Sequence, residues 1–177
     1  MDASSAYQDS LPVHPDSLIA KISSLGIEFT YYDHPPLRTV ADSKGFRDNL
    51  LTQDQGGAHI KNLYLRDKKK RNFLAVIQED KAVDLKALAE GLGGQRLSFG
   101  SEDRLLENLG VRPGAVTPLA MMHGAQKNVI LGLDRDIIDA KQIYMHPLVN
   151  DRTIGMKGAD LFVFLEAFSI TPLILDI

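Results

Sequence analysis

The 177-residue sequence contains no cysteine. Without thiols the protein can form neither disulfides nor cysteine-ligated metal sites, and it has no thiolate nucleophile. This composition fits a reducing compartment. No apolar run approaches the roughly 20 residues that a membrane span requires. Residues 1–14 include Asp2 and Asp9 and lack the apolar stretch of a signal peptide, so we expect a cytoplasmic protein with no membrane contact.

The sequence also lacks an excess of positive charge. It has 20 Lys and Arg residues and 23 Asp and Glu residues, which gives a net charge of −3. Any nucleic-acid binding must therefore come from a local basic patch. No phosphate-binding glycine loop, Rossmann glycine pattern or HExxH motif is present. The five histidines are scattered along the chain, so we expect no metal site and no cofactor.

What the chain does contain is an irregular alternation of helix and strand patterns. Apolar spacing and glycine or proline stops predict helices over 18–25, 39–50, 84–90, 104–109 and 161–167. Strands are predicted over 27–32, 60–66, 73–77, 96–99, 128–133, 142–145, 152–156 and 173–175. Because hairpin-like and crossover links both occur, the pattern predicts one α+β domain over 15–177 with a central mixed sheet flanked by helices. Residues 1–14 are expected to form a flexible N-terminal arm.

Lys61 is unusual within this pattern. Alternation along the strand places it on the same face as Leu63 and Leu65, beside the unbroken apolar strand over 73–77. A buried ammonium group needs an anionic partner, loses its proton, or faces a wet cavity. Alternatively, Lys61 lies near the strand end and extends its stem to water.

Two further segments have unusual composition. Gly110-Val-Arg-Pro-Gly114, followed by Val116-Thr-Pro118, is a constrained loop with glycines on both sides of a proline. It is either an ordinary turn or a place where backbone N–H groups can approach a ligand. His146-Pro-Leu-Val-Asn150, followed by Thr153, is a turn in which His146 either has a structural role or faces a pocket.

In this order and at this spacing, the strand lysine, the glycine loop and the histidine-proline turn resemble those of the YbaK/prolyl-tRNA-synthetase-associated domain family. Its members are deacylases that hydrolyse aminoacyl-tRNAs mischarged on tRNA(Pro). The resemblance covers roughly residues 16–175 and is closest to the free-standing branch similar to the bacterial insertion domain of prolyl-tRNA synthetase. That branch includes alanyl-tRNA(Pro) deacylases.

The resemblance implies a mixed sheet with a pocket between Lys61, the glycine loop and His146. Lys61 would engage the 3′-terminal adenosine and its phosphate, and the glycine loop would border the aminoacyl group. The implied catalytic set is Lys61, Gly110, Gly114 and His146. The implied substrate-binding set is Arg112, Pro113, Thr117, Asn150 and Thr153.

Two departures from the family pattern concern the shape of the pocket. Where the family often has an Asn-Asp pair after Thr117-Pro118, this chain has His123-Gly124. Where the family often runs through threonines and alanines after Asn150, this chain reads Asp-Arg-Thr-Ile. Both differences bear on which amino acid is accepted.

A basic turn, including Lys68, Lys69 and Lys70, joins the strand of Lys61 to the next strand. Such a run is usually a solvated hairpin tip. Given the resemblance, it is instead expected to bind the tRNA acceptor stem, which makes these three lysines substrate-binding candidates.

The resemblance therefore implies a trans-acting deacylase of mischarged tRNA(Pro), with Ala-tRNA(Pro) as the leading substrate. Cys- or Ser-tRNA is the alternative substrate, and a catalytically silent tRNA-binding relative is the alternative class. The expected partner is the aminoacylated 3′ end and acceptor stem of tRNA, with prolyl-tRNA synthetase or an elongation factor as candidates for its delivery.

Overall fold

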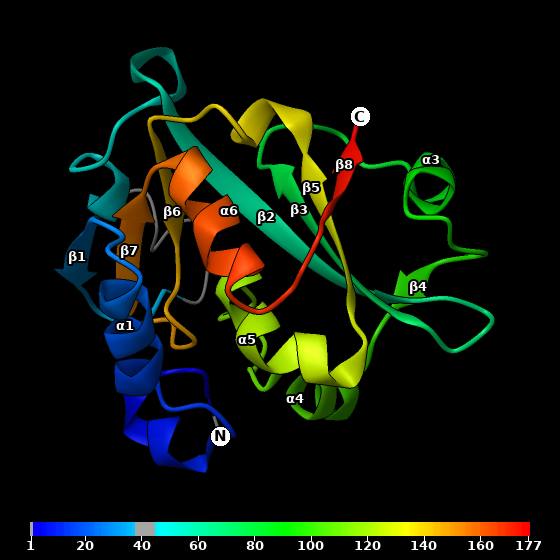
Figure 1. Cartoon of the computed structure of the whole chain (residues 1–177), viewed down its shortest axis with the longest axis horizontal. Coiled ribbons are helices and arrows are strands. Elements are labelled where there is room, and N and C mark those ends of the chain that lie inside the picture. The colour runs from blue at the N-terminus through cyan, green and yellow to red at the C-terminus, as the bar shows by residue number, and fades with distance from the viewer. Residues whose placement is uncertain (1, 38–44) are drawn as a thin grey trace.

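The computed structural model of the protein describes residues 2–37 and 45–177. Its centre is a mixed eight-stranded sheet in the order β1-β7-β6-β2-β3-β5-β8, with β4 paired to β2 off this path (Figure 1). The pairs β2/β6, β3/β5 and β5/β8 are parallel, and the other pairs are antiparallel. The predicted α+β fold with a central mixed sheet is confirmed.

The strands are short except for the central one. β2 spans Gly57–Arg66 and forms a hairpin with β3 (Asn72–Gln78). The remaining strands are β1 (Phe29–Asp33), β4 (Ser98–Phe99), β5 (Ile130–Asp134), β6 (Gln142–Met145), β7 (Arg152–Met156) and β8 (Leu173–Leu175). The α-helices described here are α1 (Pro15–Ser24), α3 (Leu85–Gly91), α4 (Glu102–Leu109), α5 (Met121–Gly124) and α6 (Gly158–Glu166).

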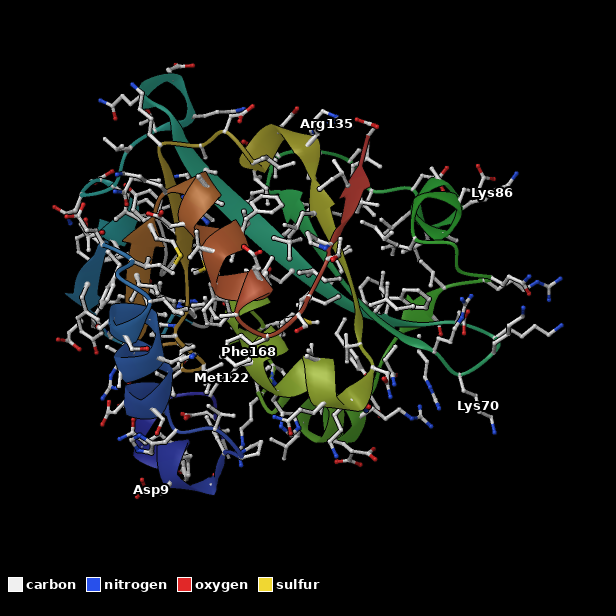
Figure 2. All side chains as sticks on the ribbon, viewed as in Figure 1. Asp9, Lys70, Lys86, Met122, Arg135 and Phe168 are labelled. Carbon is white, nitrogen blue, oxygen red and sulfur yellow. The ribbon has the colours of Figure 1, made fainter. Side chains whose placement is uncertain are left out.

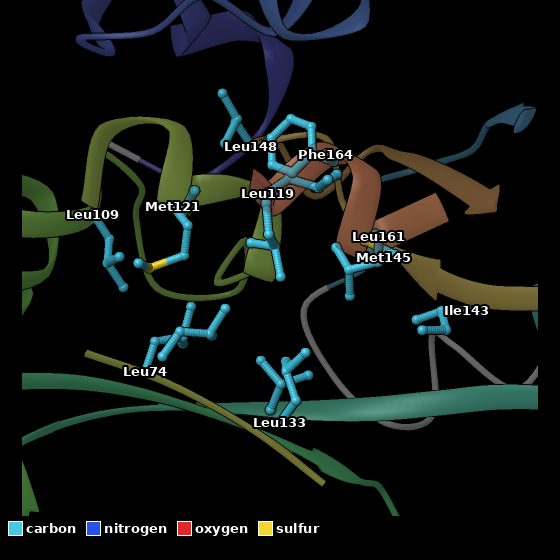
Figure 3. Close-up of a cluster of buried hydrophobic side chains, with 14 of the residues drawn as sticks. Leu74, Leu109, Leu119, Met121, Leu133, Ile143, Met145, Leu148, Leu161 and Phe164 are labelled. Carbon is cyan, nitrogen blue, oxygen red and sulfur yellow. The ribbon is translucent and has the colours of Figure 1, made fainter. Parts of the chain in front are cut away.

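Each face of the sheet carries its own apolar core. The larger core joins α1, α4, α5 and α6 to one face, and Figure 3 shows Leu74 and Leu133 of the strands opposite Leu119 and Phe164. The smaller core packs α3 against the other face, around Phe73. Alternation along β2 divides its side chains between these cores, since Tyr64 belongs to the larger core and Leu65 to the smaller.

The partner of β2 changes along its length. Residues 57–59 pair with β6, whereas Leu65 and Arg66 pair with β4. Between them, the edge of β2 that faces β6 has no strand partner among the residues that the structure describes. The two strands diverge here, and this divergence makes room for a cavity in the sheet.

Most predicted elements are present, with ends shifted by one to three residues. The strands over 142–145, 152–156 and 173–175 match the predicted bounds. Of the predicted helix over 39–50, residues 39–44 lie outside the described residues, residues 45–47 are helical, and residues 48–50 form a turn and a bend. No helix in the described part of the chain is long and apolar enough to cross a bilayer.

The N-terminal segment lies against the domain. Residues Ser5–Ser10 form a 3-10 helix, Ala3 is buried, and the Ala3 carbonyl accepts a hydrogen bond from the Asn150 N–H at 2.8 Å. Ser5 donates from its backbone N–H and its hydroxyl to the Asp151 carboxylate at 2.9 and 2.6 Å. These contacts differ from the loosely held arm that the sequence predicts, and its flexibility in solution stays a prediction.

Candidate active site

A cavity of about 100 Å³ opens where β2 diverges from β6. Ile60 and Asn62 of β2 form one wall, and Met145, His146 and Thr153 form the wall facing them. The segment after β1 covers it with the side chains of Leu37, Phe46 and Leu50. A cavity of this size holds about three water molecules, which is far smaller than a typical drug-sized pocket.

His146 is a partly buried base in this cavity. Its Nδ1 donates to the Arg152 carbonyl at 2.8 Å, because a carbonyl oxygen can only accept. Burial lowers the pKa of His146, the Arg152 carbonyl partly offsets this, and nearby His34 lowers it further. The Nε2 of the neutral ring is therefore a bare acceptor.

Thr153 is fixed by a second histidine. His34 Nε2 lies 2.8 Å from Thr153 Oγ1, and His34 Nδ1 lies 2.9 Å from the Pro35 carbonyl. Because the Pro35 carbonyl can only accept, Nδ1 carries a proton, and in the tautomer protonated at Nδ1 alone Nε2 accepts the hydrogen bond from the Thr153 hydroxyl. The rings of His34 and His146 have centroids 6.0 Å apart, so two histidines distant in sequence meet beside one hydroxyl.

The cover is held by an ion pair. Arg47 donates to both carboxylate oxygens of Glu79, at 2.6 and 2.5 Å, and both residues line the cavity. This bidentate arrangement is the strong form of a guanidinium–carboxylate contact. It neutralises the Glu79 charge, so the cavity holds no unpaired carboxylate from this residue.

Lys61 does not line the cavity. Its neighbours Ile60 and Asn62 do, and alternation turns Lys61 toward the opposite face of the sheet. Its ammonium donates to the Glu79 carbonyl at 2.9 Å and also to the Lys81 carbonyl. The anomalous strand lysine is thus satisfied by backbone oxygens, and its role in the reaction stays a prediction.

No residue of the glycine loop lines the cavity. Gly110 and Gly114 both have positive φ, of 68° and 92°. Gly110 ends α4, and a Cβ there would lie 2.6 Å from Pro12 Cγ, whereas one on Gly114 would lie 3.5 Å from Asn150 Nδ2. Pro113 is exposed, so this part of the loop is accessible to a ligand.

Asn150 connects the loop to the cover. Its backbone carbonyl accepts from Leu37 N–H at 2.9 Å, and its Nδ2 donates to the Leu37 carbonyl at 3.4 Å. Leu37 in turn lines the cavity.

Two other predicted substrate-binding residues make contacts within the protein. Arg112 donates to the Ser10 hydroxyl at 3.0 Å, and the buried Thr117 accepts from Leu119 N–H as a helix cap. The structure therefore brings His146 and Thr153 together, with Asn150 and Gly114 adjacent to their cover.

The basic turn lies at the far end of the β2–β3 hairpin. Lys68, Lys69 and Lys70 are exposed, and Figure 2 shows Lys70 on the same side of the molecule as Lys86. Since a strand rises about 3.3 Å per residue, Lys68 is about 20 Å from Asn62. The neighbouring Arg71 is not available to a ligand in the same way, because it pairs with the buried Asp67 at 2.7 Å.

This pair also affects the titration of Asp67. Burial alone would raise the pKa of Asp67, but hydrogen bonds from the Arg71 backbone and guanidinium hold it below its usual value. The pair fixes the base of the turn and leaves the three lysines to solvent.

The site predicted from the sequence omitted several residues that line the cavity, including Phe46, Asn62, Glu79 and Tyr144. It also omitted His34, whose ring lies 4.3 Å from that of Phe46 between centroids. His34 itself carried a signal, since it directly follows β1 and precedes Pro35-Pro36. In the part of the chain described, no three His, Asp or Glu side chains are grouped to hold a metal ion.

Comparison with known proteins gives the family. The family model described as "Aminoacyl-tRNA editing domain" matches residues 34–164, a range that contains all the cavity-lining residues named above. The chain therefore belongs to the aminoacyl-tRNA editing domain family, as its sequence predicted.

Individual relatives agree with this assignment. The prolyl-tRNA synthetase associated domain-containing protein 1 of Danio rerio is 38% identical over 157 residues, which is 88% of this chain and 83% of that protein. The prolyl-tRNA editing protein ProX of Acetoanaerobium sticklandii is 31% identical over 152 residues, covering 85% of this chain and 90% of that protein.

Solved structures share the fold at lower identity. A candidate trans-editing enzyme for prolyl tRNA synthetase superposes with a TM-score of 0.68 at 15% identity, over 92% of this chain and 94% of that one. The hypothetical protein APE2540 gives 0.69 at 20% identity, over 90% and 97% of the two chains.

Proposed function

We propose that this protein is a trans-acting aminoacyl-tRNA deacylase that removes a small, wrongly attached amino acid, alanine foremost, from tRNA(Pro). The observation that carries this proposal is the cavity of about 100 Å³ beside His146 and Thr153, within an editing domain. Its volume suits an alanyl, seryl or cysteinyl group and disfavours larger side chains.

The reaction requires little covalent chemistry from the protein. Water adds to the ester carbonyl carbon, the resulting oxyanion collapses, and the bond to the ribose oxygen breaks. The water proton leaves with that oxygen, giving a free amino acid and a free ribose hydroxyl. The enzyme must therefore position the ester and stabilise the oxyanion. In this proposal, backbone N–H groups of the loop at Gly110–Gly114 donate hydrogen bonds to the oxyanion. The Lys61 ammonium leaves its two carbonyl partners and binds the phosphate of the terminal adenosine.

The tRNA body is held by the basic turn. Lys68, Lys86 and Arg96 line one shallow hollow, and Lys69 and Lys70 extend from the adjacent tip. An acceptor stem lying along the β2–β3 hairpin spans the roughly 20 Å between this hollow and the cavity. The local positive charge supplies the phosphate contacts that the net charge of −3 does not.

The test is release of labelled alanine from Ala-tRNA(Pro) at catalytic amounts of protein, with Ser-, Cys- and Pro-tRNA(Pro) compared in parallel. We expect fast release from one or more of the three mischarged substrates and slow release from Pro-tRNA(Pro). Lys127→Met, which changes an exposed lysine away from the cavity, is the matched control and should retain full activity. Tight tRNA binding with no release from any substrate would contradict the proposal and favour a silent binding module.

A further inference from the structure

Phe99 is the most exposed of the large apolar side chains in the described part of the chain. Its exposed fraction is 65%, whereas that of the next, Val163, is 44%. A single exposed apolar residue is common on protein surfaces and needs no explanation by itself. The position of Phe99, between the basic hollow and the cavity, is what suggests a role.

The short strand β4 places Phe99 between these two features. At the start of β4, the Lys68 N–H donates to the Gln95 carbonyl at 3.0 Å, beside Arg96 of the basic hollow. At the end of β4, Phe99 lies opposite Leu65 of β2. Because β4 runs antiparallel to β2, Phe99 lies nearer to the cavity than the hollow does (Figure 1).

Phe99 and Lys61 project from the same face of the sheet. Residues directly opposite one another in paired strands share a face, so Phe99 lies on the face of Leu65. Alternation along β2 adds Leu63 and Lys61 to this face, followed by His59, which lines the cavity. From Leu65 to Lys61 the strand rises about 13 Å, which is the length of about four stacked nucleotides.

The backbone that carries Phe99 is firmly held. The Gly100 N–H donates to the Tyr64 carbonyl at 3.1 Å, and the Tyr64 ring packs so closely on Gly100 that a Cβ there would clash with it. The Tyr64 hydroxyl donates to Asn72 Oδ1 at 2.8 Å, which anchors the ring to β3. An aromatic ring on such a backbone loses little conformational freedom when it binds a ligand.

We propose that Phe99 is a stacking platform for an unpaired nucleotide near the 3′ end of the tRNA. This inference rests on the proposed deacylase function, which it deepens. The 3′ end of a tRNA is single-stranded beyond the acceptor stem, and bases of a single strand stack on aromatic side chains whatever their sequence. The basic hollow on one side of Phe99 and Lys61 on the other supply contacts to the phosphates. Glu102 and Asp103, which begin α4 just after Phe99, repel phosphates and keep the strand on the β2 side of the ring.

Binding of two forms of one tRNA tests the platform. Phe99→Ala should weaken the binding of uncharged tRNA(Pro) by about 5- to 150-fold, the effect of losing one base–aromatic stack. It should not weaken the binding of the same tRNA from which the unpaired 3′ end has been removed. Phe99→Tyr keeps the stacking surface and should bind both forms like the wild type. Unchanged binding of the complete tRNA, or equal weakening for both forms, would overturn the proposal.

The salt dependence of binding separates stacking from charge. Phe99→Ala removes no charge, so the slope of affinity against salt concentration should stay at its wild-type value. The variant should also melt like the wild type, because most of the ring is exposed. A slope as flat as that of the lysine variants would contradict a stacking role.

A fluorescent reporter detects the stack directly. The chain contains no tryptophan, so Phe99→Trp introduces a single indole ring. The complete tRNA should quench its fluorescence, and the tRNA without the unpaired 3′ end should quench it much less. Tyr31→Trp, which places the indole on the edge strand β1, is the matched control and should respond to neither form. Equal quenching of Phe99→Trp by both forms, or none, would overturn the platform.

Neither measurement depends on hydrolysis of an ester. A protein that hydrolyses Ala-tRNA(Pro) but shows neither selective weakening nor quenching keeps the deacylase function and lacks the platform. Selective weakening and quenching without hydrolysis would support the platform and contradict the deacylase function.

Discussion

Replacing Lys61 with methionine tests the least expected contact in this structure. The substitution keeps the apolar stem on the face of Leu63 and removes the ammonium that the carbonyls of Glu79 and Lys81 accept. A hydrogen bond to a charged group contributes about 1.5–3 kcal/mol when well shielded. Lys61 is only half-buried, so we expect the two bonds together to contribute about 1–2 kcal/mol.

For a chain of this length, each kcal/mol shifts the melting temperature by about 2–4 °C. Lys61→Met should therefore melt about 2–8 °C lower than the wild type by calorimetry. If Lys61 also binds the terminal phosphate, kcat/KM for Ala-tRNA(Pro) should fall by about 100-fold or more, because a preorganised charge in a catalytic site commonly contributes this much.

The two measurements separate the two roles. A lower melting temperature with normal kcat/KM would show that Lys61 only fastens the end of β3, and would refute its place in the reaction. An unchanged melting temperature would refute the structural argument from the carbonyl contacts. Lys127→Met controls for the loss of one exposed positive charge and should leave both quantities unchanged.

Three further predictions concern the loop, the turn and His146. Gly110→Ala places a Cβ 2.6 Å from Pro12 at a φ of 68° and should cost about 1–3 kcal/mol in urea unfolding. Gly114→Ala, whose Cβ would lie at an ordinary contact distance of 3.5 Å from Asn150 Nδ2, should cost less, and the reverse order would contradict the geometry. Replacing Lys68, Lys69 and Lys70 together with alanine should weaken tRNA binding and flatten its salt dependence, because fewer phosphate contacts release fewer counterions. Hydrolysis of a short aminoacyl-adenosine mimic should be unchanged. If the triple variant binds tRNA like the wild type at every salt concentration, the turn is only solvated. Because the folded-state pKa of His146 is lowered, its contribution to stability is present above about pH 6.5 and is lost as the pH falls through the lower, folded-state value. His146→Asn should flatten this part of the curve of unfolding free energy against pH, and an unchanged curve would mean that His146 is not the group responsible.

The sequence was most informative where local pattern decides structure. The short segments 142–145 and 152–156, on either side of the histidine-proline turn, were predicted as strands with the bounds that β6 and β7 have, and nearly all of their residues are buried. The histidine-proline turn between them was recognised by composition and places His146 at the cavity.

The sequence was least informative where contacts join distant segments. Nothing in the local pattern shows that β2 leaves β6 after His59, and this change of partner creates the cavity. The hydrogen bond between His34 and Thr153 links positions 119 residues apart. The carbonyl partners of Lys61 could not be predicted either, because every residue has a backbone oxygen and the sequence does not show which one accepts a hydrogen bond.

The order of strands has a consequence for how the domain can be produced as an isolated fragment. The family match spans residues 34–164, but the outermost strands, β1 and β8, lie outside these limits. A fragment cut at the limits of the match would expose β7 on one side of the sheet and β5 on the other, each with a row of unpaired N–H and C=O groups. Such newly exposed edges pair readily with those of other molecules, so we expect the fragment to aggregate where the 177-residue chain remains monodisperse in light scattering.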